Sequence, residues 1–295
     1  RNASRSIETK DYLELYQDVR TPDEMLYQFY DKAISTETIL QLLDMVVCSE
    51  GEVFEINCHP AFIDTILQNQ SGYCMPRIRE VDILTSQEVK EAIVNISGLG
   101  HFDFYINGEK VGNHFLDPGW TNYAKTALYQ TFDVTALLKK RNVMGVMLGN
   151  GFYNVPRERY FKQLLFFGAP KVKLALSLKY ADGSSEVVVT DRSWKVCESP
   201  ITYSSIYGGE DYDAGKYQVS WMNPGFDDDS WKTPVIAKTG MELKAQVSAP
   251  LTVRDILPVV RKYKNSKGNW VFDFGQNFSG IIRLKVKGHS GHKIT

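Results

Sequence analysis

The spacing of apolar residues along the chain changes in character near residue 93. Before this point apolar side chains recur every three or four positions, a spacing that is typical of helices. A predicted helix after Ser35 carries its apolar residues at Ile39, Leu42, Leu43, Val46 and Val47. A strand is predicted over 52–57, and a further helix begins at the capping box of 85–88 and carries Val89, Ala92 and Ile93. This part is predicted to be a short α/β fragment.

Beyond residue 93 apolar and polar residues alternate, as they do in strands with one buried face. Phe102, Phe104 and Ile106 alternate up to Asn107 and Gly108, a dipeptide that favours a two-residue hairpin turn. Further strands are predicted at 127–134, 143–148, 171–180, 186–190, 194–198, 250–261, 269–274 and 280–287. Many short strands with little helical periodicity predict an all-β sandwich, jelly-roll-like in type.

The predicted fold class is therefore α+β, with several domains. We expect the α/β fragment at 1–93, the sandwich at 94–248, and a truncated second β-domain at 249–295. Neither Gly nor Pro separates the helix predicted from residue 85 from the strand predicted at Val94. Because natural domain boundaries usually fall in flexible polar segments, we interpret the chain as two parts of different origin, joined near residues 89–94.

The charge balance divides at the same place. Residues 1–93 hold 8 of the 34 basic residues and 17 of the 35 acidic ones, a balance of −9 against +8 for the remainder. The basic residues of the second part are scattered among predicted strands, so no nucleic-acid partner is expected. No apolar run approaches the roughly 18 residues of a membrane span, so no membrane partner is expected either.

The cysteines have no metal-type spacing, and the sequence offers no certain cofactor. They are Cys48, Cys58, Cys74 and Cys197. Four thiols in a chain of this length do not suggest a disulfide scaffold, which slightly favours a reducing, cytoplasmic location. The chain opens at Arg1 rather than Met, so we expect its native start to lie upstream and read no targeting signal.

A series of short motifs runs in order through the second part. They are ISGLG (96–100), YINGEKVG (105–112), DPGWTNY (117–123), YQTFDVT (129–135), LGNGFY (148–153), YGGEDYDA (207–214), PGFDDDSW (224–231) and DFGQNFSG (273–280). With these motifs, residues 94–295 resemble the N-terminal, non-catalytic domains of bacterial α-L-rhamnosidases. The resemblance implies that the catalytic acids lie on an (α/α)₆ barrel that follows these domains. We therefore expect the missing catalytic barrel downstream and no rhamnosidase activity from this chain.

The first part carries a different set of motifs. They are EINCHP (55–60), SGY (71–73), RIRE (77–80) and LTSQEVK (84–90). With them, residues 1–93 resemble the C-terminal part of YdjC-like carbohydrate deacetylases. The resemblance implies that His59 maps onto an active-site position, as a proton donor in the ancestral enzyme. It also implies that the ligands of the family's divalent metal lie upstream, so neither that metal nor catalysis by His59 is expected here.

The rhamnosidase resemblance also indicates a sugar site. In some members the turn that corresponds to 150–154 belongs to a calcium-dependent rhamnose-binding module, so the candidate binding residues are Asn150, Tyr153 and Asn154. Trp120 is a further candidate because an aromatic ring can stack on a sugar, although aromatic residues more commonly fill sandwich cores. Calcium is a candidate cofactor of the sandwich, although Asn150 stands where Asp is common, and a neutral amide is the poorer Ca²⁺ ligand. A structural turn is the alternative for this motif.

Three functions remain open. The first is a non-catalytic accessory region of an α-L-rhamnosidase, which contacts rhamnose-containing glycans or braces a catalytic barrel. The second is a calcium-dependent L-rhamnose-binding module. The third is metal-dependent deacetylation of N-acetylated oligosaccharides, with a site completed by another chain.

Overall fold

The structure is a computed structural model that describes residues 88–156, 158–159, 166–237 and 239–295, together with the backbone of 62–64, 74–77 and 81–82. The predicted elements before residue 62, and His59, lie outside the described residues. Two compact units are present. One holds the described residues up to Gly112 and those between Leu116 and Ala249, and the other consists of Asn113–Phe115 and Pro250–Thr295. The described part is all-β, with two short 3₁₀ helices at Thr135–Leu137 and Ala214–Lys216.

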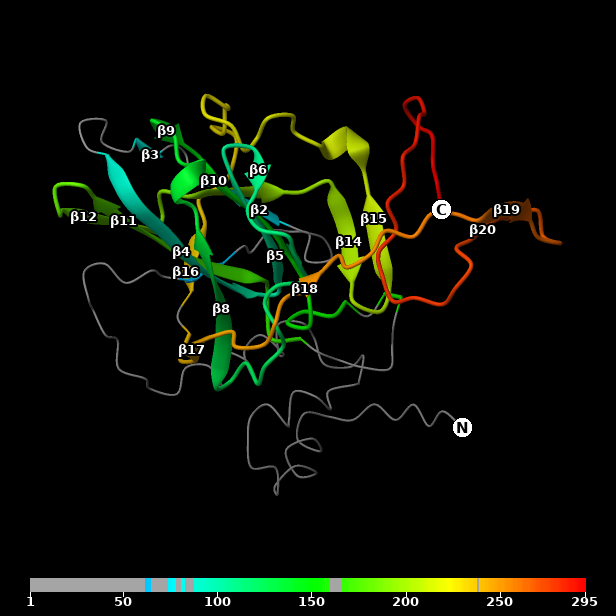
Figure 1. The fold of residues 1–295 in the computed structure, drawn as a ribbon, viewed down its shortest axis with the longest axis horizontal. Coiled ribbons are helices and arrows are strands. Elements are labelled where there is room, and N and C mark those ends of the chain that lie inside the picture. The colour runs from blue at the N-terminus through cyan, green and yellow to red at the C-terminus, as the bar shows by residue number, and fades with distance from the viewer. Residues whose placement is uncertain are drawn as a thin grey trace, which may run out of the picture. The chain divides into compact units, whose positions relative to one another are not determined.

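The first sheet of the larger unit is built around β4 and β11 (Figure 1). Its strands are, in spatial order, β16 (Val235–Ala237), β1 (Phe62–Asp64), β11 (Lys171–Tyr180), β4 (Val89–Leu99), β8 (Thr126–Asp133) and β17 (Glu242–Ala245), with β12 (Ser185–Val189) also beside β11. All neighbours are antiparallel except β17 and β8, which run parallel.

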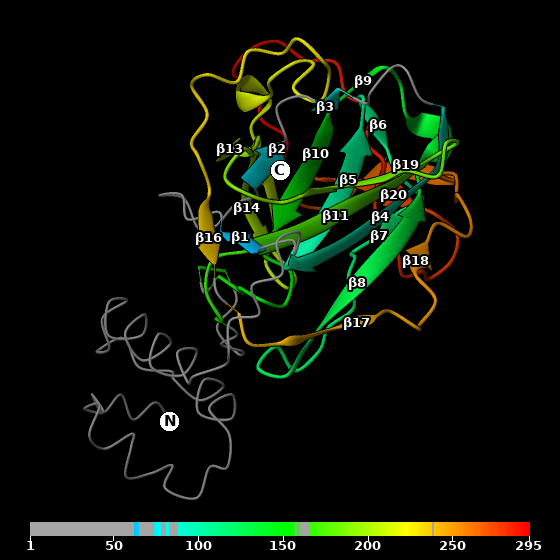
Figure 2. The same ribbon diagram turned by 90° about the vertical axis from the view of Figure 1, so that its left-hand side faces the viewer.

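The second sheet is antiparallel throughout and is labelled in Figure 2. Its strands are β13 (Lys195–Glu198), β2 (Cys74–Arg77), β10 (Met144–Gly149), β5 (His101–Ile106) and β6 (Glu109–Lys110). Two small ribbons complete the unit: β14 (Ile201–Ser205) with β15 (Gly209–Tyr212), and β3 (Val81–Asp82) with β9 (Arg141–Asn142).

The hydrophobic core draws its residues from both sheets. Every second side chain of β11 is buried, and β4 follows the same alternation from Ala92 to Ile96, beyond which its residues are all buried. They form one cluster with apolar residues of the second sheet, including Phe102, Phe104, Ile106, Met144, Val146 and Leu148. Two sheets that share one core in this way form a β-sandwich. Each fully buried Leu, Ile, Val or Phe contributes about 1.5–3 kcal/mol to the free energy of unfolding.

The predicted hairpin at Asn107 and Gly108 is confirmed. Both residues adopt positive φ, 52° and 88°, as a type I′ turn requires. The Asn107 side chain accepts a hydrogen bond from the Val143 N–H at 3.0 Å and donates to the Asn142 Oδ1 at 2.9 Å. The turn between β5 and β6 is thereby tied to the start of β10.

The helix predicted from residue 85 is wrong over the residues that the structure describes. Val89, Ala92 and Ile93 lie in β4, an eleven-residue strand paired with β11 and β8. The capping-box pattern is a local signal, whereas pairing on both edges of a strand is a tertiary one. Here the tertiary interactions determine the conformation, and the β-branched residues Val89 and Ile93 suit it.

The other strand predictions divide clearly. Those predicted between residues 127 and 198 are confirmed to within one residue at each end, and 171–180 coincides with β11. The strand predicted at 269–274 is confirmed as β20 (Trp270–Asp273). The prediction at 250–261 is wrong for most of its length, because only Leu251–Thr252 forms a strand (β18) before β19 starts at Arg261. The prediction at 280–287 is wrong, since this stretch has no neighbouring strand within the described residues.

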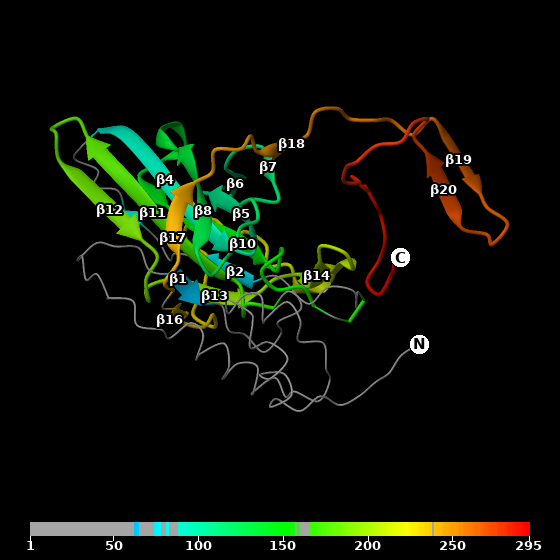
Figure 3. The ribbon, with the colours of Figure 1, turned by 90° about the horizontal axis from the view of Figure 1, so that it is seen from below.

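The second unit is small and mostly exposed. In it, β7 (His114–Phe115) pairs with β18, and β19 (Arg261–Lys264) forms a hairpin with β20, the two strands side by side in Figure 3. The Asn265 side chain accepts hydrogen bonds from the N–H groups of Lys267 and Asn269, both at 3.0 Å, and so holds the turn of that hairpin. Across the described residues, no helix is long and apolar enough to cross a membrane.

Candidate functional site

Three loops of the sandwich bring three aromatic rings together, two of them exposed. Trp120 precedes β8, Phe152 follows β10, and Tyr207 lies in the turn between β14 and β15. The Trp120 and Phe152 rings are stacked, with centroids 5.2 Å apart and planes at 17°, and Tyr207 meets Phe152 edge-on at 6.2 Å. Trp120 is 56% exposed and Tyr207 43% exposed. We call these three residues the aromatic platform.

A buried histidine supports the platform from beneath. The His101 ring contacts Phe152 edge-on, with centroids 6.1 Å apart, and the residue is buried. Burial lowers the pKa of His101 to about 4, because desolvation penalises the charged imidazolium. At neutral pH His101 is therefore an uncharged ring. Glycine is required at position 151 beside it, because φ is +51° and a Cβ there would lie 2.9 Å from the backbone nitrogen of His101.

Asn150 and Asn154 are buried beneath this surface. The Asn150 amide nitrogen donates to the Ser204 carbonyl at 2.9 Å, and its side-chain oxygen accepts from the Asn154 amide at 3.1 Å. The Asn154 N–H also donates to the Asn150 carbonyl at 3.1 Å. These bonds fix the loop that carries Phe152 and tie it to β14. Both asparagines thus lie inside the molecule and set the shape of the loop.

The same bonds decide whether calcium fits at Asn150. Its side-chain oxygen, the atom that would bind a cation, already accepts the Asn154 amide. Among the described residues no three His, Cys, Asp or Glu side chains gather into a cluster able to hold a metal ion. Hard cations such as Ca²⁺ are bound by six to eight oxygen ligands, whereas the Asn150 side-chain oxygen is engaged in a hydrogen bond that holds its own loop.

Tyr153 points into a separate small core. It is 5% exposed, and its ring packs edge-on against Tyr123, with centroids 5.1 Å apart, and in a tilted arrangement against Phe167, with centroids 5.7 Å apart. Of the four predicted sugar-binding residues, the structure therefore brings only Trp120 to the surface. Phe152 and Tyr207 were missed by sequence reasoning. The LGNGFY motif contained a signal for Phe152, but strand alternation does not continue through a turn and could not show which aromatic residue faces outward.

A charged pair borders the platform on the side of Tyr207. Arg159 donates from Nη1 to the Asp211 Oδ1 at 3.0 Å, with a second contact through Nη2. The guanidinium also lies over the Tyr203 ring, 4.0 Å from its centroid. Tyr203 is buried, and a Cβ at Gly208 would meet its hydroxyl at 2.6 Å. The pair and the glycine together fix the turn that presents Tyr207.

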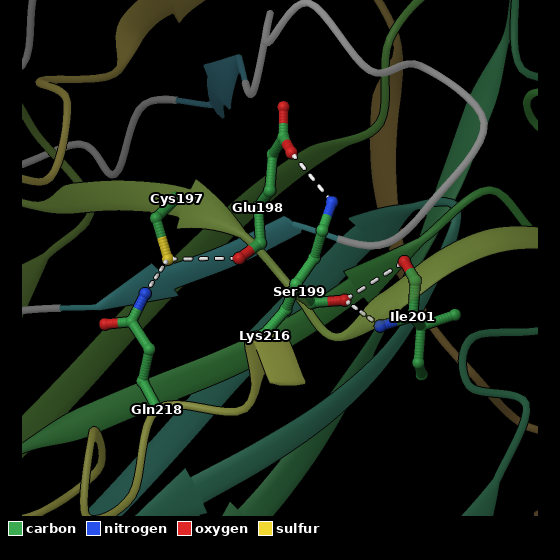
Figure 4. A network of polar contacts seen from close by, with 6 residues as sticks. All are labelled: Cys197, Glu198, Ser199, Ile201, Lys216 and Gln218. Atoms are coloured by element: carbon green, nitrogen blue, oxygen red, sulfur yellow. Dashed lines mark hydrogen bonds and ion pairs between the residues drawn. The ribbon is translucent and has the colours of Figure 1, made fainter. Parts of the chain in front are cut away.

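A second polar cluster surrounds β13 and has a structural explanation (Figure 4). The Gln218 amide nitrogen lies 3.5 Å from the Cys197 Sγ, while its oxygen accepts the Trp231 indole N–H at 3.0 Å. The Lys216 Nζ lies 3.8 Å from a Glu198 carboxylate oxygen. These contacts hold the segment around the second 3₁₀ helix against β13. Both the amide nitrogen and the amide oxygen of Gln218 take part.

Comparisons with known proteins match the two parts of the chain separately. The family profile of the alpha-L-rhamnosidase N-terminal domain matches residues 87–255, and that of the bacterial alpha-L-rhamnosidase concanavalin-like domain matches 263–295. The profile of YdjC-like proteins matches residues 2–95. Both resemblances inferred from the motifs are confirmed.

Individual relatives agree with this division. An alpha-L-rhamnosidase of Formosa agariphila is 38% identical over 221 residues, which is 71% of this chain and 23% of the relative. A carbohydrate deacetylase of Enterococcus faecalis is 99% identical over 93 residues, 32% of this chain and 36% of the relative. A solved structure, the Streptomyces avermitilis alpha-L-rhamnosidase complexed with L-rhamnose, matches with a TM-score of 0.65 and 31% identity, over 70% of this chain and 20% of that one.

This chain thus spans about a third of the matched deacetylase and less than a quarter of each of these two rhamnosidases. Its described β-domains agree in fold with the rhamnosidase structure, and the profile of the N-terminal domain covers more than half of its residues. The chain belongs to the alpha-L-rhamnosidase N-terminal domain family, and within it a YdjC-like segment precedes that domain.

Proposed function

We propose that the sandwich is a non-catalytic accessory domain that binds L-rhamnose, or glycans containing it, at the aromatic platform. L-rhamnose has a methyl group and ring C–H groups that suit an aromatic face, and hydroxyl groups that need polar neighbours. An exposed tryptophan ring stacked on Phe152 and a charged pair nearby offer both kinds of contact.

The observation that carries the proposal is the exposure of Trp120. Two other tryptophans of the unit, Trp194 and Trp221, are 0% and 1% exposed, as expected of large apolar rings. Trp120 is 56% exposed although it is already stacked on Phe152. A large ring held rigidly at the surface loses little conformational entropy when a ligand stacks on it, so binding is favoured by preorganisation.

The comparisons support the choice of ligand. The matched relatives are alpha-L-rhamnosidases by name, and the Streptomyces avermitilis enzyme was solved in complex with L-rhamnose. We further propose that binding needs no Ca²⁺, since the Asn150 oxygen is engaged by Asn154. Asn150 and Asn154 act by positioning the Phe152 loop.

The test is a titration of the purified chain with L-rhamnose, with and without added Ca²⁺, followed by calorimetry and ¹⁵N NMR. Trp120→Ala is expected to weaken binding about tenfold, equivalent to about 1.4 kcal/mol. The matched control is Trp270→Ala, which removes an equally exposed tryptophan (55%) from the other unit and should leave the affinity unchanged.

Dispersed signals that do not shift with L-rhamnose would reject sugar binding and leave the bracing of a catalytic domain as the role of the sandwich. Equal losses from Trp120→Ala and Trp270→Ala would reject the platform as the site. Binding only in the presence of Ca²⁺ would overturn the metal-independent form of the proposal.

Deacetylation remains a second proposal, favoured by the 99% identity of the first 93 residues to a carbohydrate deacetylase. Its candidate residue, His59, lies outside the described residues. Release of acetate from N-acetylated chito-oligosaccharides by the purified chain, with divalent metal added, would support it. A chain that releases none would end it.

A further inference from the structure

Both sheets of the sandwich contain a strand from the YdjC-like segment. The profile of the rhamnosidase N-terminal domain begins at residue 87, whereas β1 and β2 lie at Phe62–Asp64 and Cys74–Arg77. β1 belongs to the first sheet and β2 to the second. Sequence that matches one family therefore takes part in the hydrogen-bonded ladders of the other.

Neither strand is a peripheral addition. β1 lies between β11 and β16, and β2 lies between β10 and β13. Within the described residues, β16 and β13 join their sheets through these strands and through no other. Withdrawal of β2 would leave the facing edges of β10 and β13 unpaired, beside buried residues such as Leu148 and Val196. Backbone polar groups near a core need such partners.

The ladder around Pro76 shows how a strand of foreign sequence is accommodated. Pro76 pairs with Val196, but Val196 exchanges its N–H and C=O with Lys232, at 2.8 and 2.9 Å. The Pro76–Val196 pair is thus a non-hydrogen-bonded one, where the missing N–H of proline costs nothing on the β13 side. On the β10 side, toward which the proline nitrogen points, the ladder is interrupted at Pro76, and the paired residues are Gly145 with Arg77 and Leu148 with Cys74 on either side of it.

We propose that the sandwich contains two strand-acceptor slots, one between β10 and β13 and one between β11 and β16. Their occupant is the YdjC-like segment of the same chain, residues 62–64 and 74–77. Recognition runs through the main chain, as in other cases of strand addition, so a segment of unrelated sequence fits. The proposal is independent of sugar binding. It means that the two sequence families form one folding unit here.

A native thiol allows a direct test in the full chain. Cys74 pairs with Glu198, two positions along the ladder from the pair of Pro76 and Val196. Because the two pair types alternate along an antiparallel ladder, the Cys74–Glu198 pair is also non-hydrogen-bonded. Such pairs have Cα atoms about 4.5 Å apart, inside the range that a disulfide spans. We would replace Glu198 by Cys, with Cys197→Ser to remove the neighbouring thiol, oxidise the protein, and identify linked peptides by mass spectrometry.

The matched control is Lys195→Cys in the same Cys197→Ser background. Residue 195 lies on the same strand but pairs with Arg77, about three residues or 10 Å along the ladder from Cys74. A Cys74 link is expected at least about tenfold more often with Glu198→Cys than with Lys195→Cys, because only the first places two thiols within bonding range. Asp64→Cys with Lys171→Cys, a register pair of β1 and β11, tests the other slot.

Intramolecular links at both pairs would support the proposal. Absence of the Cys74 link in folded Glu198→Cys protein would overturn it, as would equal yields from the two single-position variants. In the unsubstituted chain, a Cys74–Cys197 disulfide would show a ladder displaced by one residue and would also overturn the stated register. Links formed only between two chains would show that the occupant comes from a second copy, against the proposal.

Discussion

β11 of the sandwich and β20 of the second unit both direct alternate side chains to two faces, yet the apolar side chains of β11 are buried and those of β20 are exposed. In β11 the alternate residues Val172, Leu174, Leu176 and Leu178 are at most 1% exposed. In β20 Trp270 and Phe272 are 55% and 45% exposed. β11 has a second sheet across from it, whereas β20 has only its hairpin partner β19 within the second unit. Alternation determines which side chains share a face, but burial requires an opposing layer.

The largest expected effect comes from cutting into the layered core. Leu174→Ala should lower the free energy of unfolding by about 2–5 kcal/mol, because it removes transfer free energy and leaves a cavity in a close-packed interior. Phe272→Ala, a larger truncation on the exposed face of β20, should change it by less than about 0.5 kcal/mol. Urea unfolding followed by tryptophan fluorescence measures both. Similar losses at the two positions would contradict the contrast between the units.

The histidines show the same contrast between a buried and an exposed unit. His101 of the sandwich is buried, whereas His289 and His292 of the second unit are exposed. The dependence of stability on pH therefore tests the burial of His101. The folded-state pKa of His101, about 4, lies below the value of 6.5 for an unfolded histidine. The unfolded chain therefore binds the proton first, and stability present above pH 6.5 is lost as the pH falls toward 4. The loss should approach about 3 kcal/mol.

Urea midpoints measured between pH 7 and 4 would test this expectation. The control is His101→Phe, which keeps a ring against Phe152 but carries no titratable group, so the component of the pH dependence due to residue 101 should vanish. A variant with an unchanged pH profile would show that other groups cause the dependence.

The smallest of the three effects concerns the strand-acceptor slot between β10 and β13. Met75→Pro should destabilise the chain by about 1–3 kcal/mol, because Met75 and Cys197 form a hydrogen-bonded pair by the alternation of the ladder and the Cys197 carbonyl would lose its donor. Pro76→Ala, at the neighbouring position, should cause no such loss. Thermal unfolding of both variants compares them, and equal destabilisation would argue against the assigned register.

The sequence predicted the sandwich well where local pattern and tertiary surroundings agree. β11 alternates over ten residues, and the turn at Asn107 and Gly108 needs the positive φ angles that this dipeptide tolerates. Both kinds of signal are read from neighbouring residues. The stretch at 280–287 looks equally strand-like, yet within the described residues no ladder forms there, because alternation alone does not provide a partner strand.

The remaining features depend on residues far apart in the chain. Val89 and Ile93 follow a capping box, but β8 and β11 pair with their strand, and this could not be read from residues 85–93. The platform joins loops around Trp120, Phe152 and Tyr207, which only the folded sheets bring together. Trp120 was a candidate only because an aromatic ring can stack on a sugar. The inward direction of Asn150 and Tyr153 follows from the turn geometry, which periodicity does not encode.

The position of β4 has a consequence for proteolysis. The two family profiles overlap at residues 87–95, and β4 spans Val89–Leu99 with a neighbour on each edge. A protease needs an exposed stretch of chain that can leave its partners, and cleavage therefore concentrates in loops and at termini. The stretch where the two family profiles meet is protected by the hydrogen bonds of a central strand. Digestion of the folded protein would therefore not cut the chain between the two family segments.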